Sequence, residues 1–295
     1  MKKTQKKSVL GILILTFLLL SPSSSESRIK FELKFFGGGN ILQAGDLNSG
    51  IRGLVDNWHD DPEVTITGGR FRPIEYGFEY GAEFIVNFIP QIGIGIGACY
   101  LQAYRSSRLE STWFDGESYI DTFKPKIRAV PVSCSLHFRL PVASFLSVTA
   151  TAGASYYYGT VNWNLHWELT NGQGSYDESW KSKSETIGYH GGLGFEFHLG
   201  HGISLVIEGL ERFATLKDLK GDLNRIWKSP GLEQSNPIKN ATFWYTEYKS
   251  LATDKVFPLV VIDSEMPSDL SYSSVRKGKV DLSGIALRTG FEIKF

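Results

Sequence analysis

The feature that most constrains the fold of this chain is an alternation of apolar and polar residues along eight separate segments. In one of them, apolar Phe78, Tyr80 and Phe84 alternate with polar Glu79 and Glu83. Successive side chains of a β-strand point to opposite faces, so this period of two predicts strands between an apolar and a polar environment. The eight segments cover residues 29–35, 78–88, 92–100, 130–139, 145–158, 187–199, 203–208 and 285–295.

The connections between these segments alternate between short and long. Three are tight, at residues 89–91, 140–144 and 199–202, and four are long, at residues 39–76, 105–123, 161–183 and 216–281. In an up-and-down barrel this order places the tight turns at one end and the long loops at the other. We therefore predict an all-β, up-and-down antiparallel barrel of eight strands. A further hairpin, of residues 242–248 and 257–262, leaves ten strands open as the alternative.

The composition excludes two other classes of protein. Lys plus Arg and Asp plus Glu are both 31, so the net charge is zero, whereas a nucleic-acid-binding protein needs a basic surface. Charged residues make up 21% of the chain, too many for a bundle of membrane helices. We therefore expect no nucleic-acid partner and no helical membrane domain.

The first residues have the features of a secretory signal peptide. Four lysines within residues 2–7 precede an apolar run at residues 9–20, and a serine-rich stretch follows at residues 21–25. The apolar run is shorter than the about 20 residues that a spanning helix needs, which argues against an uncleaved anchor. We assign residues 1–27 to the signal peptide and residues 28–295 to the mature barrel domain.

The orientation of the two faces decides between two kinds of barrel. A secreted soluble barrel with its apolar face around an apolar ligand shows the same alternation and is the alternative fold. The polar face favours a membrane barrel, because its charges of both signs and its many glycines suit a narrow interior. The apolar face has tyrosines near the long loops and phenylalanines near the tight turns, as expected for two membrane interfaces.

The last strand provides a further sign, because apolar Phe291 and Ile293 alternate before the terminal Phe295. With the alternation and the uneven loops, this ending resembles the small bacterial outer-membrane β-barrel proteins, the OmpA- and OmpW-like superfamily. The resemblance implies a transmembrane barrel in the outer membrane of a Gram-negative bacterium, surrounded by outer-membrane lipid. It also implies that the barrel-assembly machinery reads Phe291, Ile293 and Phe295. The resemblance covers the strands and termini, not the long loops.

Charged residues lie in phase on the predicted inner face. Eight strands leave an interior filled by side chains, which favours a salt-bridged plug over a narrow channel for ions or small solutes. The predicted network consists of Lys30, Glu32, Lys34, Glu79, Glu83, Arg139, Glu196, Glu208, Arg288, Glu292 and Lys294.

The long loops carry all the tryptophans: Trp58, Trp113, Trp163, Trp167, Trp180, Trp227 and Trp244. Disordered segments are poor in aromatics, so we expect these loops to fold. Apolar residues at helical spacing predict two short helices, over residues 46–58 with Asp46 as N-cap and over residues 216–227. The tryptophans either pack within a cap over the barrel or form an interaction surface for an extracellular ligand.

Signals for catalysis and cofactors are weak. Ser135 and His137 lie about 7 Å apart along one strand, too far for a nucleophile and its base. His59, Asp60, Asp61 and Glu63 lack the ligand spacing of a calcium loop. We therefore expect no catalytic residues, no cofactor and no metal site. The chain is predicted to have a structural or surface-interaction role, and a lipid hydrolase or acyltransferase is the enzymatic alternative.

The two cysteines are predicted to be free thiols on opposite sides of the wall. Cys99 is in phase with Gly95 and Gly97 on the inner face, whereas Cys134 is in phase with Val132 and Leu136 on the outer face. Side chains that point apart cannot form a disulfide.

Overall fold

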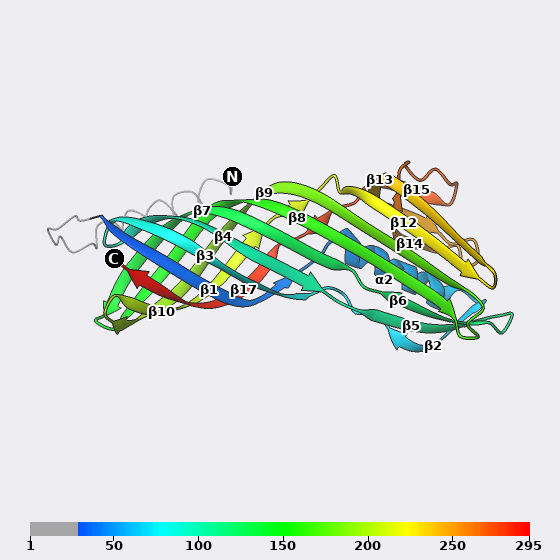
Figure 1. Cartoon of the computed structure of the whole chain (residues 1–295), viewed down its shortest axis with the longest axis horizontal. Coiled ribbons are helices and arrows are strands. Elements are labelled where there is room, and N and C mark those ends of the chain that lie inside the picture. The colour runs from blue at the N-terminus through cyan, green and yellow to red at the C-terminus, as the bar shows by residue number, and fades with distance from the viewer. Residues whose placement is uncertain (1–28) are drawn as a thin grey trace, which may run out of the picture.

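The computed structural model describes residues 29–295, so the predicted signal peptide lies outside the described residues. The chain is almost entirely antiparallel β-sheet, with one helix in the described part (Figure 1). The elements are β1 (Lys30–Leu42), α2 (Asp46–Asp60), β2 (Val64–Arg70), β3 (Tyr76–Ile89), β4 (Ile92–Tyr104), β5 (Ser107–Trp113), β6 (Ser118–Phe123), β7 (Lys126–Ala143), β8 (Leu146–Leu169), β9 (Ser175–Gly200), β10 (Ile203–Phe213), β11 (Thr215–Leu216), β12 (Lys220–Ser229), β13 (Leu232–Lys249), β14 (Val256–Asp263), β15 (Tyr272–Lys277), β16 (Val280–Asp281) and β17 (Gly284–Lys294).

Eight strands form a ring in which each strand pairs with two neighbours. The order is β1, β3, β4, β7, β8, β9, β10 and β17, and β17 pairs back onto β1. All these pairings are antiparallel, so the predicted all-β, up-and-down architecture of eight strands is confirmed. The predicted hairpin of β13 and β14 also forms, but it lies outside the ring, so the number of ring strands is eight.

Beyond the ring, β8 and β9 continue into a second, open sheet. On the β8 side the sheet adds β6, β5 and β2, and on the β9 side it adds β12, β13 and β14, with β15 paired to β13. Figure 1 shows the ring in the left half of the elongated molecule and this open sheet in the right half. We call the open sheet together with α2 the cap, and its end away from the ring the far rim.

Helix α2 contacts both β14 and β2, the two edges of the open sheet. Its apolar face explains this position, because Leu47, Ile51 and Val55 are buried in one large apolar cluster with the inward side chains of the open sheet. Two glycines allow the close approach to β14. A Cβ on Gly53 would lie 1.8 Å from the carbonyl oxygen of Pro258, and one on Gly50 would lie 2.1 Å from Cγ2 of Val260.

Two predictions about helices are wrong in part. The first helix forms, but Gly45 is its N-cap residue, and the Asp46 carboxylate instead accepts hydrogen bonds from Arg276 and from the backbone N–H of Lys279. The second predicted helix, over residues 216–227, is absent because this segment is paired in β11 and β12. Within residues 29–295 no helix is long and apolar enough to cross a membrane.

Candidate functional site

The polarity of the two sheet faces reverses along single strands where the ring becomes the cap. On β9 the outward side chains are apolar from Leu199 to Ile187 and polar from Glu185 to Asp177. On β8 the outward face changes in the same way between Tyr158 and Thr160. The inward face changes in the opposite sense, from serines and threonines in the ring to Val161 and Trp163 in the cap. The ring is therefore polar inside and apolar outside, and the cap is the reverse.

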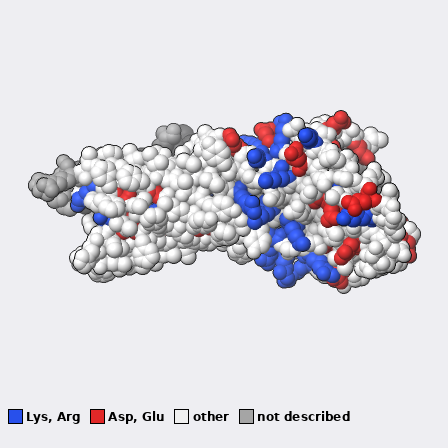
Figure 2. Space-filling view, in the orientation of Figure 1, with Lys and Arg blue, Asp and Glu red and all other residues white. Residues whose placement is uncertain are grey.

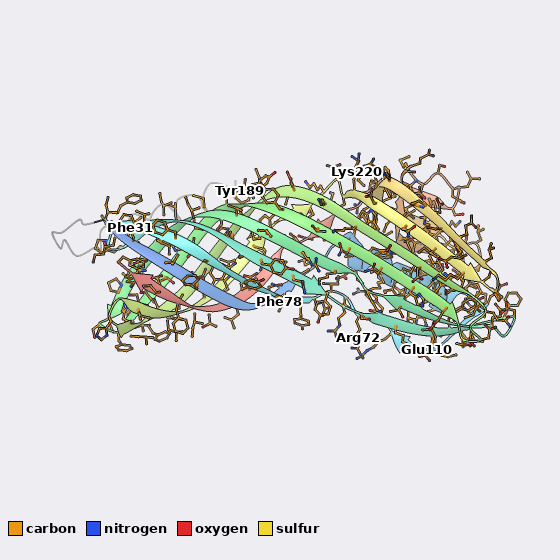
Figure 3. The ribbon with its side chains drawn as sticks, viewed as in Figure 1. Phe31, Arg72, Phe78, Glu110, Tyr189 and Lys220 are labelled. Carbon is orange, nitrogen blue, oxygen red and sulfur yellow. The ribbon has the colours of Figure 1, made fainter. Side chains whose placement is uncertain are left out.

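The outer face of the ring is a continuous apolar belt. Large exposed apolar side chains include Phe31, Phe35, Phe78, Tyr80, Phe84, Ile96, Val132, Leu136, Tyr158, Ile187, Tyr189, Leu193, Phe195, Leu287, Phe291 and Phe295. In the described part of the ring strands, charged residues in phase with this face occur only toward the cap: Lys126 and Arg128 on β7, Glu211 on β10, and the cap portions of β8 and β9. Figure 2 shows far fewer charged side chains on the visible face of the ring than on that of the cap. In Figure 3, Phe31, Phe78 and Tyr189 lie on the ring, whereas Arg72, Glu110 and Lys220 lie beyond it.

Arg139 is the centre of the first ion-pair network inside the ring. It donates two hydrogen bonds to Glu32, both of 2.8 Å, and further bonds to Glu292 (2.7 Å) and Glu196 (2.5 Å). Lys294 also bonds to Glu196. Glu32, Glu196 and Glu292 are buried, so these carboxylates depend on the two cations for compensation.

A second network lies nearer the cap. The Glu79 carboxylate accepts hydrogen bonds from Arg212 and Arg288, each of 2.5 Å. Separate pairs join Lys34 to Glu208 and His137 to Glu83, the latter at 2.9 Å.

Every member of the predicted network except Lys30 and Glu83 therefore forms an ion pair, and Glu83 forms a hydrogen bond with His137. Lys30 is exposed at the start of β1 and forms none with a described residue. The predicted network lacks two of the partners, Arg212 and His137. Arg212 could have been found by extending the alternation of residues 203–208 by four residues, since Glu208 and Arg212 are in phase.

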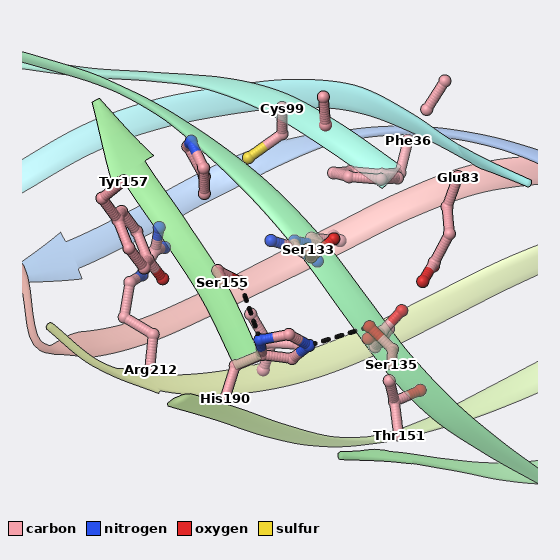
Figure 4. Close-up of a pocket in the computed structure, with 16 residues that line it drawn as sticks. Phe36, Glu83, Cys99, Ser133, Ser135, Thr151, Ser155, Tyr157, His190 and Arg212 are labelled. Atoms are coloured by element: carbon pink, nitrogen blue, oxygen red, sulfur yellow. Dashed lines mark hydrogen bonds between the residues drawn. The ribbon is translucent and has the colours of Figure 1, made fainter. Parts of the chain in front are cut away.

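The space left inside the ring is small. One cavity has a volume of about 30 Å³ and a second of about 20 Å³. The first holds a Ser135–His190–Ser155 chain, in which His190 Nε2 lies 3.0 Å from Ser135 Oγ and Nδ1 lies 3.1 Å from Ser155 Oγ (Figure 4). Nδ1 of His190 thus bonds to the hydroxyl of Ser155 and not to a carboxylate. The side chain of Ser135 is buried. These volumes hold about one water each.

The seven tryptophans are divided between the interior of the cap and its far rim, so they do not form one surface. Trp163 and Trp180 are buried in the cap core, where Trp180 stacks on Phe243. Trp58 packs against Phe123, and Trp244 donates a hydrogen bond to the Asp263 carbonyl oxygen. The other three belong to an aromatic chain at the far rim: Trp113, Tyr119, Trp167, Tyr176 and Trp227. Of the seven, which all lie in the described part of the chain, only Trp227 is exposed, at 47%, so the far rim presents an aromatic side chain to solvent.

One buried carboxyl lies beside this cluster. Asp121 of β6 points to the inside of the cap and lies opposite Trp167 of β8. Burial raises the pKa of Asp121 to about 7, and the positive charge of His166 offsets only part of that effect.

Basic side chains gather where the ring meets the cap, and we call this band the basic collar (Figure 2). Its exposed members are Arg70, Arg72, Arg105, Lys124, Lys181, Lys183, Lys217 and Lys220. Lys220 lies directly opposite Lys183 in the strand register, and like charges at opposed positions are destabilising in a sheet. None of these residues forms an ion pair with another residue in the described range 29–295. The collar therefore has positive charge available for an external anion.

Both cysteines are free thiols, as predicted. Cys99 is buried beside the first cavity, whereas Cys134 is exposed on the outer face. No protein-family model matches the chain, and no curated protein matches it either.

Proposed function

We propose that this chain is an outer-membrane β-barrel protein of a Gram-negative bacterium, with a structural or surface-interaction role. In this proposal the ring spans the bilayer, and the cap stands in water on the extracellular side. The observation that carries the proposal is the reversal of polarity along β8 and β9. Soluble monomeric proteins rarely expose a continuous apolar surface of this extent, so an outward apolar belt that ends where the same strands become polar outside favours a membrane-spanning ring.

The height of the belt supports the membrane location. From Ile187 to Leu199, β9 covers about 40 Å of extended chain. With the tilt of about 40° usual in such barrels, this corresponds to about 30 Å along the axis. The hydrocarbon core of a bilayer has about the same thickness. Phe291 and Phe295 lie exposed on the outer face, where the barrel-assembly machinery would contact them.

The same geometry favours an anchored cap over a channel or an enzyme. The charged groups of the interior are paired with one another, and the cavities between them are too small for a hydrated ion. The Ser135 hydroxyl lies inside the wall, away from lipid. The part of the protein suited to a partner is then the far rim, where the aromatic chain ending at Trp227 meets solvent.

A matched pair of lysine substitutions on β9 tests the membrane location. Leu193 and Ser179 both point outward and are exposed, but Leu193 lies in the apolar belt and Ser179 in the cap. We expect Leu193→Lys to lower the stability of the inserted protein by about 2–4 kcal/mol and Ser179→Lys to change it little. Urea unfolding in vesicles measures both. Equal, small effects of the two substitutions would contradict the proposal, as would release of the wild-type protein from membranes by carbonate.

A further inference from the structure

A groove of about 420 Å³ crosses the boundary between the apolar belt and the basic collar. On the belt side it is lined by the outward side chains of Tyr76, Phe78 and Tyr104, which are all exposed. On the collar side it is lined by Arg72 and Arg105. Figure 3 shows Phe78 on the ring and Arg72 further along toward the cap. The groove thus joins an apolar floor to two guanidinium groups.

The arginine side of the groove is held by hydrogen bonds although it lies in connections between strands. Ser107 Oγ accepts a hydrogen bond from the backbone N–H of Arg72 (2.8 Å) and donates one to its carbonyl oxygen (3.1 Å). Asn48 of α2 bonds to both backbone groups of Ile74, two residues further on. These contacts tie the backbone of the Arg72 segment to the Arg105 segment and to the cap, so the chain that carries the two arginines is held in place.

The charge of the groove is uncompensated. Within residues 29–295 neither guanidinium forms an ion pair, and no carboxylate lines the groove. Lys126, with its Nζ 5.9 Å from the ring centre of Tyr104, adds a third cation beside it. A planar guanidinium fork binds phosphate oxygens in a bidentate manner, and two such forks in one groove suit a single phosphate group.

We propose that this groove binds a phosphate-bearing membrane lipid, with the phosphate between Arg72 and Arg105 and an acyl chain along Phe78 and Tyr76. The inference rests on the proposed function, because the lipid enters the groove from the bilayer that surrounds the belt. It goes further by assigning a specific lipid site to one side of the collar.

Native mass spectrometry of the purified, detergent-solubilised protein with phosphatidylglycerol tests the site. The double substitution Arg72→Ala/Arg105→Ala should weaken the tightest lipid binding about tenfold through loss of two charge-assisted contacts. Arg72→Lys/Arg105→Lys keeps the charge but loses the fork, so it should give an intermediate affinity. The control Lys228→Ala/Lys255→Ala removes the same charge from ion pairs toward the far rim and should leave binding unchanged.

Two further probes identify what the groove recognises. Diacylglycerol, which lacks the phosphate, should not occupy the site, and glycerol 3-phosphate, which lacks the chains, should not displace phosphatidylglycerol at equal concentration. Equal binding of diacylglycerol, displacement by glycerol 3-phosphate, or unchanged affinity of the Arg72→Ala/Arg105→Ala variant would each overturn the inference.

Carbonate extraction of the same proteins separates this inference from the proposed function. If the wild-type protein resists extraction and the double alanine variant binds phosphatidylglycerol as well as wild type does, only the lipid site is wrong. If carbonate releases the wild-type protein, the proposed function fails, and the lipid site fails with it. Resistance of the double alanine variant to extraction shows that its loss of lipid binding does not come from misfolding.

Discussion

At the residue scale, the interior of the ring depends on cations that several carboxylates share. Arg139 of β7 bonds to three buried glutamates from β1, β9 and β17, so one side chain connects strands on opposite sides of the ring. The alternation predicted that these charges face inward. It could not predict their pairing, because the partners depend on strand register and on the angle at which each strand crosses the ring. Lys30 shows that phase alone does not predict pairing. It is in phase with the network, but it is exposed at the first position of β1 and forms no ion pair with a described residue.

Arg139→Leu should strongly destabilise the ring. It leaves three buried carboxylates without their main cation, and removal of one partner from a buried ion pair costs about 3–5 kcal/mol. Urea unfolding of the protein inserted in vesicles measures the loss. Lys30→Ala is the control and should change the free energy of unfolding by less than about 0.5 kcal/mol. Equal effects of the two substitutions would show that the network does not stabilise the ring.

Asp121 should make the stability of the cap depend on pH. Burial raises the pKa of Asp121 from 3.8 to about 7, so the folded protein binds the proton more tightly than the unfolded chain does. The free energy of unfolding should therefore fall as pH rises from about 4 to about 7, and then level off. Asp121→Asn removes this dependence and should stabilise the cap by about 1–3 kcal/mol at pH 8 and little at pH 4. Urea unfolding followed by tryptophan fluorescence at both pH values measures this difference, and a variant less stable than wild type at pH 8 would contradict it.

At the element scale, β8 and β9 combine two polarity patterns in one strand. The alternation predicts their ring portions. Because the two faces exchange polarity where the cap begins, the same pattern predicts a loop over residues 161–183. The false helix over residues 216–227 has a related cause. Leu216 belongs to β11 and Leu223 to β12, and a short link between the two strands shifts the phase. The resulting spacing resembles that of a helix, and only the pairing of β12 with β9 and β13 decides the outcome.

The close contact of α2 with β14 predicts a specific weakness in the cap. Gly53→Ala would place a methyl group 1.8 Å from the Pro258 carbonyl oxygen, so the helix must move away from β14. We expect a loss of about 1–3 kcal/mol in cap stability, as is usual for overpacking, and an unchanged ring. Hydrogen exchange of β14 and of ring strand β1 measures the two parts separately. The neighbouring Arg52→Ala, on the exposed face of α2, should leave both unchanged, and faster exchange in β1 would contradict the independence of the two parts.

At the scale of the whole molecule, the ring and the cap place their apolar side chains on opposite faces of the sheet. The cap encloses an apolar core built around α2, whereas the ring leaves its apolar surface outside and pairs its charges within. The eight-strand ring was predictable because its pattern is local and repeats along the chain. The joining of four separate long connections into one open sheet was not, because it depends on pairings such as β6 with β8 and β9 with β12. For the same reason the tryptophans could be placed beyond the ring but not divided between the core and the far rim.

The most direct test of the central claim is the environment of the outward face along β9. In a background without Cys99 and Cys134, Phe195→Cys and Ser179→Cys place single thiols on this face, in the belt and in the cap respectively. With the protein in vesicles, Phe195→Cys should react with a reagent confined to the bilayer and not with a water-soluble maleimide present on both sides, and Ser179→Cys should do the opposite. Reaction of Phe195→Cys with the maleimide, or with neither reagent, would contradict a ring that spans the membrane.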